Sequence, residues 1–224
     1  MENDIEKRRA RVRELQAEFA TRGDTLGWFE ALYKEAAGDN DVIPWADLEP
    51  NLYFRAWAEE HDLKGSGRTA LVVGCGLGDD AKYLHDLGFK VTAFDISPTA
   101  IDWAKKLYGD ADIRFETADL FQPLRGWLGA FDFVLEIYTI QPLPLEMRPQ
   151  VVDAVAAFVG EGGTLVVVTR GRGDDEEPDI LPWPMSRRDL SRFETNGLKQ
   201  LSFTELPPEN EDEPSRFVVE YKRV

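Results

Sequence analysis

The stretch from Leu71 to Ser97, LVVGCGLGDDAKYLHDLGFKVTAFDIS, constrains the fold more than any other part of the chain. It begins with a short apolar run, which is typical of a strand that is covered on both faces. A glycine-rich turn follows, and its glycines let the backbone turn sharply and approach a ligand without Cβ clashes. An amphipathic helix begins near Asp79, and a second apolar run ends at Asp95. The stretch therefore predicts one βαβ unit of a nucleotide-binding fold, with the ligand at the carboxyl edge of the sheet.

The spacing of the glycines indicates which nucleotide the turn can hold. A dinucleotide fingerprint reads G-x-G-x-x-G, whereas this run is Gly74-Cys75-Gly76-Leu77-Gly78-Asp79. Asp79 replaces the third fingerprint glycine, and its carboxylate would repel a phosphate at the N-terminus of a helix. The same carboxylate suits a ligand that carries an ammonium or a sulfonium. A nicotinamide-dependent oxidoreductase stays open as an alternative, but the turn weighs against it.

The G-x-G-x-G turn, followed by Asp95 at the end of the second strand, resembles the class I S-adenosylmethionine-dependent methyltransferases. The resemblance implies a Rossmann-like α/β fold with a seven-stranded, mostly parallel sheet, one antiparallel strand near the end and helices on both faces. It implies S-adenosyl-L-methionine as the cofactor and SN2 transfer of its methyl group, with no metal. Catalysis would come mainly from alignment and desolvation of the reactants. A cofactor-binding protein without turnover is the alternative.

The C-terminal half narrows the resemblance to one branch of the family. The segments PLPLEMRPQVVDAVAAFVGEGGTLVVVT and ILPWPMSRRDL are similar to segments of the thiopurine/thiol methyltransferase-like branch. The similarity covers about residues 70–200. In that branch the loop after the fifth strand helps to cover the acceptor, which implies that Arg148 and Trp183 lie on the acceptor side.

The resemblance also assigns roles at the adenosine end of the cofactor. Asp95 should accept hydrogen bonds from both ribose hydroxyls, because a carboxylate offers two acceptor oxygens. Ile96 would lie against the adenine face. Asp119, at the end of the third strand, would accept from the exocyclic amine, and the backbone N–H of Leu120 would reach the ring. The alternative for Asp119 is a helix cap or a turn residue.

The methionyl end of the cofactor is expected against the glycine turn and the end of the fourth strand. The residues concerned are Gly74, Cys75, Gly76, Glu136 and Ile137. The catalytic candidates are Glu136, as partner of the methionyl ammonium or as general base, and Tyr138, which would orient the acceptor or simply pack. Cys75 is expected to be a small filler and not a catalytic thiol.

Residues 1–64 are expected to form an N-terminal helical cover in the same domain as the cofactor-binding part, residues 65–224. Apolar stripes predict helices over residues 3–21, 25–37 and about 52–61.

Two aromatic residues of this cover, Tyr33 and Trp45, are candidates for a lid. An aromatic face attracts a sulfonium by a cation–π contact worth about 0.5–2 kcal/mol. Tyr33 is also a candidate on the acceptor side, and Trp45 on the cofactor side. The alternative is that both are ordinary core aromatics.

Beyond the first βαβ unit, the pattern predicts alternating helices and strands. Ser97 and Pro98 predict the N-cap and first residue of a helix. Further strands are expected near residues 113–115, 131–141, 164–169, 199–206 and 216–222, and further helices over 146–159 and 186–195.

The charge balance bears on the possible partners. The net charge is −16, and the chain lacks the basic patch with which polyanion binders neutralise phosphates. Nucleic acid is therefore not expected as a partner, nor is an anionic membrane surface. The single cysteine and the absence of a long apolar run favour a cytoplasmic protein with a small-molecule acceptor. The oligomeric state stays open.

The loop from Gly171 to Pro178 carries four consecutive acids, Asp174 to Glu177. If their charge faces the acceptor, it disfavours anionic acceptors and favours neutral or cationic ones. A charge run is more often a solvated face, which is the alternative.

Overall fold

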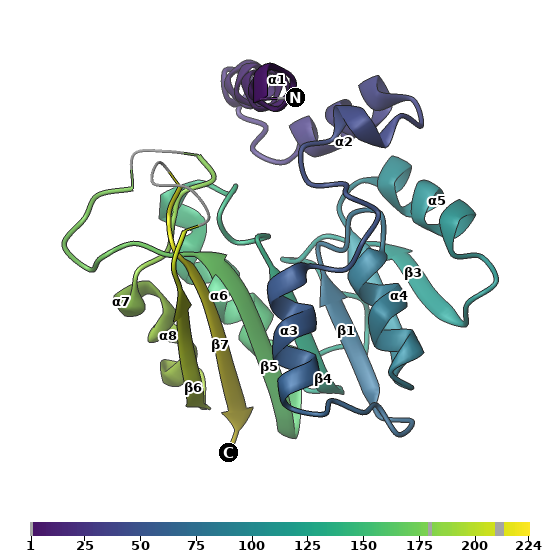
Figure 1. Ribbon diagram of the computed structural model, residues 1–224, viewed down its shortest axis with the longest axis vertical. Coiled ribbons are helices and arrows are strands. Elements are labelled where there is room, and N and C mark those ends of the chain that lie inside the picture. The colour runs from purple at the N-terminus through teal and green to yellow at the C-terminus, as the bar shows by residue number, and fades with distance from the viewer. Residues whose placement is uncertain (1, 179–180, 209–212) are drawn as a thin grey trace.

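A seven-stranded sheet with the order β3-β2-β1-β4-β5-β7-β6 forms the centre of the computed structural model, which describes residues 2–178, 181–208 and 213–224 (Figure 1). The strands are β1 (Thr69–Val73), β2 (Lys90–Asp95), β3 (Ile113–Thr117), β4 (Phe131–Ile137), β5 (Val159–Arg170), β6 (Leu198–Leu206) and β7 (Arg216–Arg223). β7 runs antiparallel to β5 and β6, whereas the pairs among β1 to β5 are parallel. The predicted fold class is confirmed.

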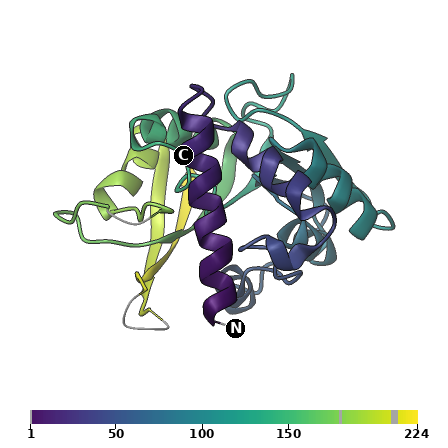
Figure 2. The same cartoon turned by 90° about the horizontal axis from the view of Figure 1, so that it is seen from above.

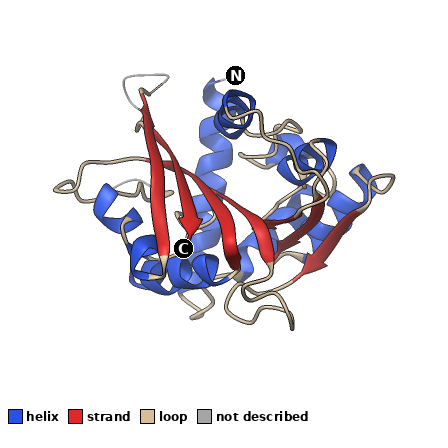
Figure 3. Cartoon of the chain, turned by 90° about the horizontal axis from the view of Figure 1, so that it is seen from below, coloured by secondary structure: helices blue, strands red, loops and turns tan. Residues whose placement is uncertain are grey.

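Helices cover both faces of the sheet, as Figure 3 shows from below. One face carries α3 (Leu52–Glu60), α4 (Asp79–Asp86) and α5 (Pro98–Leu107), and the other carries α6 (Arg148–Ala157), α7 (Arg187–Leu190) and α8 (Arg192–Thr195). Alternate strand residues face opposite ways because the side-chain period of a strand is two. Val166 and Val168 of β5 pack with Phe54 of α3, whereas Leu165 and Val167 pack with the α6 side.

Three predicted boundaries are wrong in detail. β5 begins at Val159 rather than Thr164, because Gly162 and Gly163 form an irregularity inside the strand and not a turn before it. β4 ends at Ile137, since Tyr138 adopts a positive φ of 55° that a strand does not allow. The predicted helix over 186–195 divides at Ser191 into α7 and α8.

The N-terminal helices α1 (Glu2–Ala20) and α2 (Gly27–Ala36) lie over the carboxyl edge of the sheet (Figures 1 and 2). Their apolar side chains form a small core that includes Leu15, Leu32 and Leu77, the last of which belongs to the glycine turn. α3 instead packs on a sheet face, so the residues before 64 have two different positions. The division of the chain at residue 64 stays a prediction. Along the described ranges, the structure contains no helix with the length and apolarity to cross a membrane.

One side chain, Glu30, attaches α2 to the start of α5. Its carboxylate accepts hydrogen bonds from the Ser97 hydroxyl at 2.6 Å, the Thr99 hydroxyl at 2.8 Å and the Thr99 backbone N–H at 3.1 Å. Partial burial opposes ionisation, but these bonds together lower the pKa of Glu30. Glu30 therefore connects the cover to the residues that follow Asp95.

We expect Glu30→Ala to loosen the cover while leaving the sheet intact. The loss of hydrogen bonds to a charged group should reduce the local opening free energy of α2 by about 1–3 kcal/mol. Hydrogen exchange of the α2 amides measures this. Glu35→Ala is the matched control, because Glu35 forms an exposed pair with Arg11 that should contribute less than about 1 kcal/mol. Equal loss of protection in both variants would contradict the role of Glu30.

Candidate active site

The glycine turn that joins β1 to α4 needs glycine for backbone geometry and for space. Gly74, Gly76 and Gly78 have φ values of 59°, 53° and 92°. A Cβ on Gly74 would lie 2.5 Å from Thr139 Oγ1, and one on Gly78 would lie 2.7 Å from the Phe115 ring. The turn is therefore packed tightly between the loop after β4 and the side chains of β3.

The N-terminus of α4 carries two acids that have partners of their own. The Tyr108 hydroxyl donates to Asp79, and the backbone N–H of Asn51 donates to Asp80 Oδ1 at 2.8 Å. Burial raises the pKa of Asp79, and it raises the pKa of Asp80 to about 7. These carboxylates stand where a dinucleotide phosphate would bind, which agrees with the argument from the glycine spacing.

Asp95, at the carboxyl end of β2, is 7% exposed and is directly attached to the glycine turn. Its Oδ2 accepts from the Gly76 N–H at 2.9 Å, and its Oδ1 accepts from the Ser97 N–H at 2.9 Å. Burial raises the pKa of Asp95, against the effect of these backbone bonds. The backbone N–H of Ile96 also interacts with this carboxylate, and the remaining acceptor capacity of its two oxygens is open to ligand hydroxyls.

Glu136, at the end of β4, is a second buried acid and is 1% exposed. Its Oε1 accepts from the backbone N–H groups of Thr139 at 2.7 Å and Ile140 at 3.0 Å. Its Oε2 is buried without a hydrogen-bond partner, and burial raises the pKa of Glu136 to about 7. Within the described ranges, no lysine or arginine forms an ion pair with Glu136 or with Asp95.

The N-terminal cover reaches the glycine turn through Tyr33. The Tyr33 hydroxyl lies 3.1 Å from where a Cβ on Gly76 would stand, and it accepts a hydrogen bond from Trp45 Nε1 at 2.9 Å. Burial and the nearby Asp95 charge raise the pKa of Tyr33 well above its ordinary value. Trp45 is 41% exposed and meets the Tyr33 ring edge-on at 6.3 Å between centroids. Both predicted lid residues thus lie together beside the turn.

Asp119 serves as a turn residue after β3. Its Oδ1 accepts from the Phe121 N–H at 2.9 Å, and its Oδ2 accepts from Gln122 Nε2 at 3.0 Å. The backbone N–H of Ala118 donates to the Asp95 carbonyl at 3.0 Å, which places the loop beside Asp95. Leu120 is half-buried next to it. The geometry matches the turn alternative for Asp119, and the adenine role stays a prediction.

Three other predicted cofactor residues, Cys75, Ile96 and Ile137, are half-buried around the same edge. Burial raises the pKa of the Cys75 thiol well above its usual value, so the sulfur stays protonated at neutral pH. This agrees with the expectation that Cys75 is a filler.

The two catalytic candidates of β4 project to different sides of the sheet. Tyr138 packs with the cluster on the α3 face, whereas Ile140, to which Glu136 is bonded, belongs to the α6 face. Burial raises the pKa of Tyr138, and the nearby Arg216 guanidinium acts against this rise. Glu136 and Tyr138 therefore do not form an adjacent acid–base pair.

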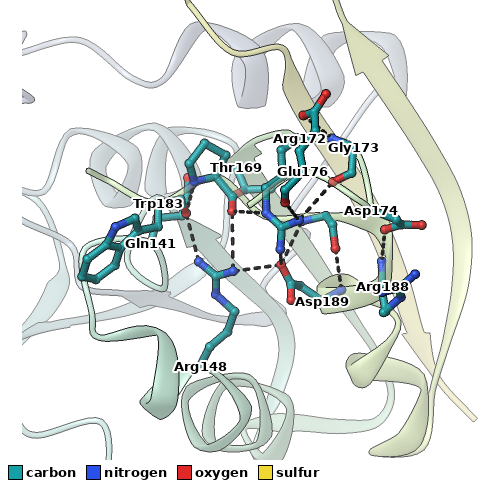
Figure 4. Close-up of polar contacts among 12 residues, drawn as sticks. Gln141, Arg148, Thr169, Arg172, Gly173, Asp174, Glu176, Trp183, Arg188 and Asp189 are labelled. Atoms are coloured by element: carbon teal, nitrogen blue, oxygen red, sulfur yellow. Dashed lines mark hydrogen bonds and ion pairs between the residues drawn. The ribbon is translucent and has the colours of Figure 1, made fainter. Parts of the chain in front are cut away.

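Arg148 is occupied in a buried ion-pair network (Figure 4). Its Nη1 pairs with Asp189 Oδ2 at 2.8 Å, and its Nη2 donates to the Trp183 carbonyl at 3.0 Å. Arg172 pairs with the same Asp189 oxygen at 2.9 Å. The Trp183 ring points away from these guanidiniums. Arg148 thus holds the loop around residue 183 in place, which favours a structural role over contact with the acceptor.

Some residues at this edge were not found from the sequence. Gln141 is buried and connects three segments, since its side chain donates to the Trp183 and Arg170 carbonyls and accepts from the Arg170 N–H. Thr139 packs against Gly74. The only available signal was position, because both residues follow a predicted strand at the ligand edge.

A cavity of about 580 Å³ lies beyond the ends of β5 and β7. Its lining includes Arg170, Arg172 and Arg187 as well as Asp174, Glu176 and Glu177 of the acidic loop. Asp174 accepts from the Arg188 N–H and Glu176 from the Gly173 N–H, each at 2.8 Å. The cavity is thus bordered by both signs of charge.

Comparison with known proteins shows a methyltransferase domain and similar methyltransferases. Residues 70–163 match the family model described as a methyltransferase domain. The chain is 23% identical over 176 residues to the 2-heptyl-1-hydroxyquinolin-4(1H)-one methyltransferase of Mycobacteroides abscessus, covering 75% of this chain and 76% of that protein. The chain spans half or less of the length of the other curated relatives that it matches.

Two solved structures share the fold. The Burkholderia thailandensis 1,6-didemethyltoxoflavin-N1-methyltransferase, with its substrate and S-adenosylhomocysteine bound, has a TM-score of 0.66 at 15% identity, over 88% of this chain and 85% of that chain. The N-methyltransferase NodS from Bradyrhizobium japonicum, with S-adenosylhomocysteine bound, has a TM-score of 0.65 at 18% identity, over 86% of this chain and 96% of that chain.

These likenesses identify the chain as an S-adenosylmethionine-dependent methyltransferase, with the methyltransferase domain over residues 70–163. S-adenosyl-L-methionine is its cofactor, and the nicotinamide-dependent alternative is thereby set aside. In this methyltransferase the glycine turn, Asp95 and Glu136 meet at one edge, where the fold places the ligand.

The Arg148 network gives a stability prediction for the methyltransferase. Asp189→Asn keeps the shape of the side chain but leaves two largely buried guanidiniums without a carboxylate. We expect the free energy of unfolding in urea to fall by about 2–4 kcal/mol. Asp174→Asn, which alters an exposed carboxylate, should change it by less than about 0.5 kcal/mol. Similar values for both variants would contradict the network's role.

Proposed function

We propose that this methyltransferase acts on a small-molecule acceptor and that two buried carboxylates, Asp95 and Glu136, hold its cationic cofactor. The observation that carries the proposal is the unpartnered Oε2 of Glu136, buried at the ligand edge without a cation in the described part of the chain. A buried acceptor without a partner costs about 1–3 kcal/mol, which a ligand donor would recover.

The charge of the ligand follows from the same site. Burial raises the pKa of Glu136 because it disfavours the ionised form of the carboxyl group. A methionyl ammonium would donate to this carboxylate and favour its ionised form. A pyrophosphate would instead meet Asp79, Asp80 and Asp95, which repel it. The site therefore selects a cation over a dinucleotide.

The cofactor, when bound, would supply an electrophilic methyl group: a lone pair of the acceptor attacks the methyl carbon, and S-adenosylhomocysteine leaves with the electron pair of the broken S–C bond. The chain's own residues bind and orient. Asp95 accepts from the ribose hydroxyls, and Glu136 accepts from the ammonium. Trp45 presents aromatic surface beside the turn, whereas Tyr33 is a buried core aromatic that accepts a hydrogen bond from Trp45. Tyr138, held with φ 55° at the end of β4, orients the acceptor. Exclusion of water by the cover strengthens these electrostatic contacts.

A small-molecule acceptor is supported by the relatives and by the charge of the chain. The similar protein of Mycobacteroides abscessus is a methyltransferase of a hydroxyquinolinone, and the structurally similar protein of Burkholderia thailandensis is a methyltransferase of a didemethyltoxoflavin. A net charge of −16 is poorly suited to a nucleic-acid acceptor. The assignment to the thiopurine/thiol methyltransferase-like branch rests on the motif resemblance and leaves the acceptor atom open, and a cytoplasmic location rests on composition.

Transfer of labelled methyl groups tests the acceptor class. Protein is incubated with S-adenosylmethionine carrying a radioactive methyl group and with separate low-mass, protein and RNA fractions of a cell extract. We expect label in the low-mass fraction alone. Label in protein or RNA would contradict the proposal, and binding of S-adenosylhomocysteine without any transfer would favour a protein that binds the cofactor without turnover.

The raised pKa of Glu136 predicts how cofactor affinity depends on pH. In the folded protein without ligand, burial raises the pKa of Glu136 from 4.5 to about 7. The contribution of Glu136 to folding stability is therefore fully present below pH 4.5 and is lost as the pH rises through about 7. The ammonium prefers the ionised carboxylate. Affinity for S-adenosylhomocysteine should therefore rise by up to about tenfold per pH unit below 7 and then level off.

Calorimetric titration from acidic to neutral pH, in two buffers of different ionisation enthalpy, measures both affinity and proton release. Glu136→Gln should bind more weakly and without this pH dependence. A variant that keeps the wild-type pH profile would assign the titration to another group.

A further inference from the structure

Two arginines face each other across the ends of β5 and β7. Arg170 is the last residue of β5, Arg216 is the first of β7, and the two are direct partners in the antiparallel register. Directly opposed residues of such a pair have Cβ atoms about 4.5–5.5 Å apart, and like charges in these positions destabilise a sheet. Both side chains lie on the α3 face, because they alternate in step with Val168 and Val218.

Within the described ranges, few carboxylates pair with these two arginines. Arg216 is 7% exposed, pairs with Glu213 at 2.8 Å and donates to the Pro214 carbonyl. The same Glu213 also faces Arg9 of α1 at 3.7 Å. For Arg170, none of the described carboxylates forms an ion pair with its guanidinium. Among the residues that the structure describes, Glu213 is thus the one carboxylate that pairs with Arg216 and Arg9, and Arg170 has none.

Hydrogen-bonding capacity is also left over in this cluster. The Nε of Arg216 is buried without a partner. Burial lowers the pKa of Arg170, and the neighbouring charges of Arg216 and Arg9 lower it further. An arrangement of this kind is costly in the absence of an anion and favourable in its presence.

The position of the pair separates it from the cofactor end of the sheet. β4 lies between β1 and β5, and β7 lies one strand beyond β5 (Figure 1). At about 4.8 Å per strand, Arg170 and Arg216 stand roughly 10–15 Å along the edge from the glycine turn. Tyr138 lies beside Arg216, and Arg170 lines the 580 Å³ cavity. The pair thus belongs to the side where the acceptor approaches.

We propose that Arg170 and Arg216 form an anion subsite that binds a carboxylate of the acceptor. The inference rests on the proposed function and adds the chemical class of its substrate. A carboxylate matches the planar fork of a guanidinium, and two guanidiniums hold it in a fixed orientation. Asp174 and Glu176 of the loop after β5 accept from backbone N–H groups, and Glu177, Glu205 and Glu213 line the same cavity. The carboxylate must therefore be held by close contact with the two guanidiniums.

The subsite has a consequence for stability that needs no substrate. Arg170→Met removes an unpaired charge beside two like charges and keeps the aliphatic packing. The midpoint of thermal unfolding of the free protein should therefore rise. A lower midpoint would show that Arg170 supports the fold and would contradict the proposal.

Binding of benzoate tests the subsite directly, with the isosteric neutral benzamide as the ligand control. Titrations use the full chain saturated with S-adenosylhomocysteine, at constant ionic strength and up to about 20 mM ligand. Wild-type protein should bind benzoate and not benzamide, and Arg170→Met should weaken benzoate binding at least about tenfold. Arg187→Met is the matched control, because Arg187 lines the same cavity but already pairs with Glu205 and covers the Phe203 ring. It should bind benzoate as wild type does.

The affinity for S-adenosylhomocysteine separates the two possible sources of a carboxylate. Arg170→Met should keep this affinity within about threefold. If Arg170→Met instead lowers the affinity for S-adenosylhomocysteine tenfold and leaves benzoate binding unchanged, the guanidinium binds the methionyl carboxylate and the proposal is overturned. The proposal is also overturned if wild type does not bind benzoate. If wild type fails to bind S-adenosylhomocysteine, the proposed cofactor site is wrong. Binding of benzoate and of benzamide to the ligand-free protein then still tests the anion subsite.

Discussion

Burial of two carboxylates at one edge of the sheet is the constraint on which the active site depends. Asp95 is the last residue of β2 and Glu136 the last but one of β4, the strands on either side of β1, and both are almost inaccessible to solvent. A buried carboxylate is tolerated when backbone N–H groups or a cation compensate for lost hydration. Backbone N–H groups of Gly76, Ser97 and the loop after β4 compensate for part of the lost hydration. We propose that a cationic ligand supplies the remaining compensation.

The glycine turn and the cover serve the same arrangement. The positive φ of Gly76 directs its N–H to Asp95, and Tyr33 closes over the turn from α2. Glu30 holds α2 to the residues that follow Asp95. The cover is therefore tied to the strand end that carries one of the two acids, and its displacement would expose that acid to water.

Local features of the site could be predicted from the sequence, and distant pairings could not. The stretch from Leu71 to Ser97 folds as expected, since its glycines, cap and strand end are decided by neighbours along the chain. The role of Arg148 depends on Asp189, 41 residues later, and no periodicity shows this pairing. Likewise, the opposition of Arg170 and Arg216 depends on the register of β5 and β7. The end of β4 was missed because Glu136 bonds the backbone beyond it and diverts the chain.

Recognition of the cofactor's ammonium by Glu136 can be measured directly. Calorimetry compares S-adenosylhomocysteine with its analogue that lacks the amino group, on wild type and Glu136→Gln at neutral pH. We expect wild type to bind the complete ligand about 10- to 100-fold more tightly than the analogue, because a hydrogen bond between charged groups contributes about 1.5–3 kcal/mol. The variant should hardly distinguish the two ligands. Equal affinities for both ligands in wild type would show that Glu136 does not recognise the ammonium.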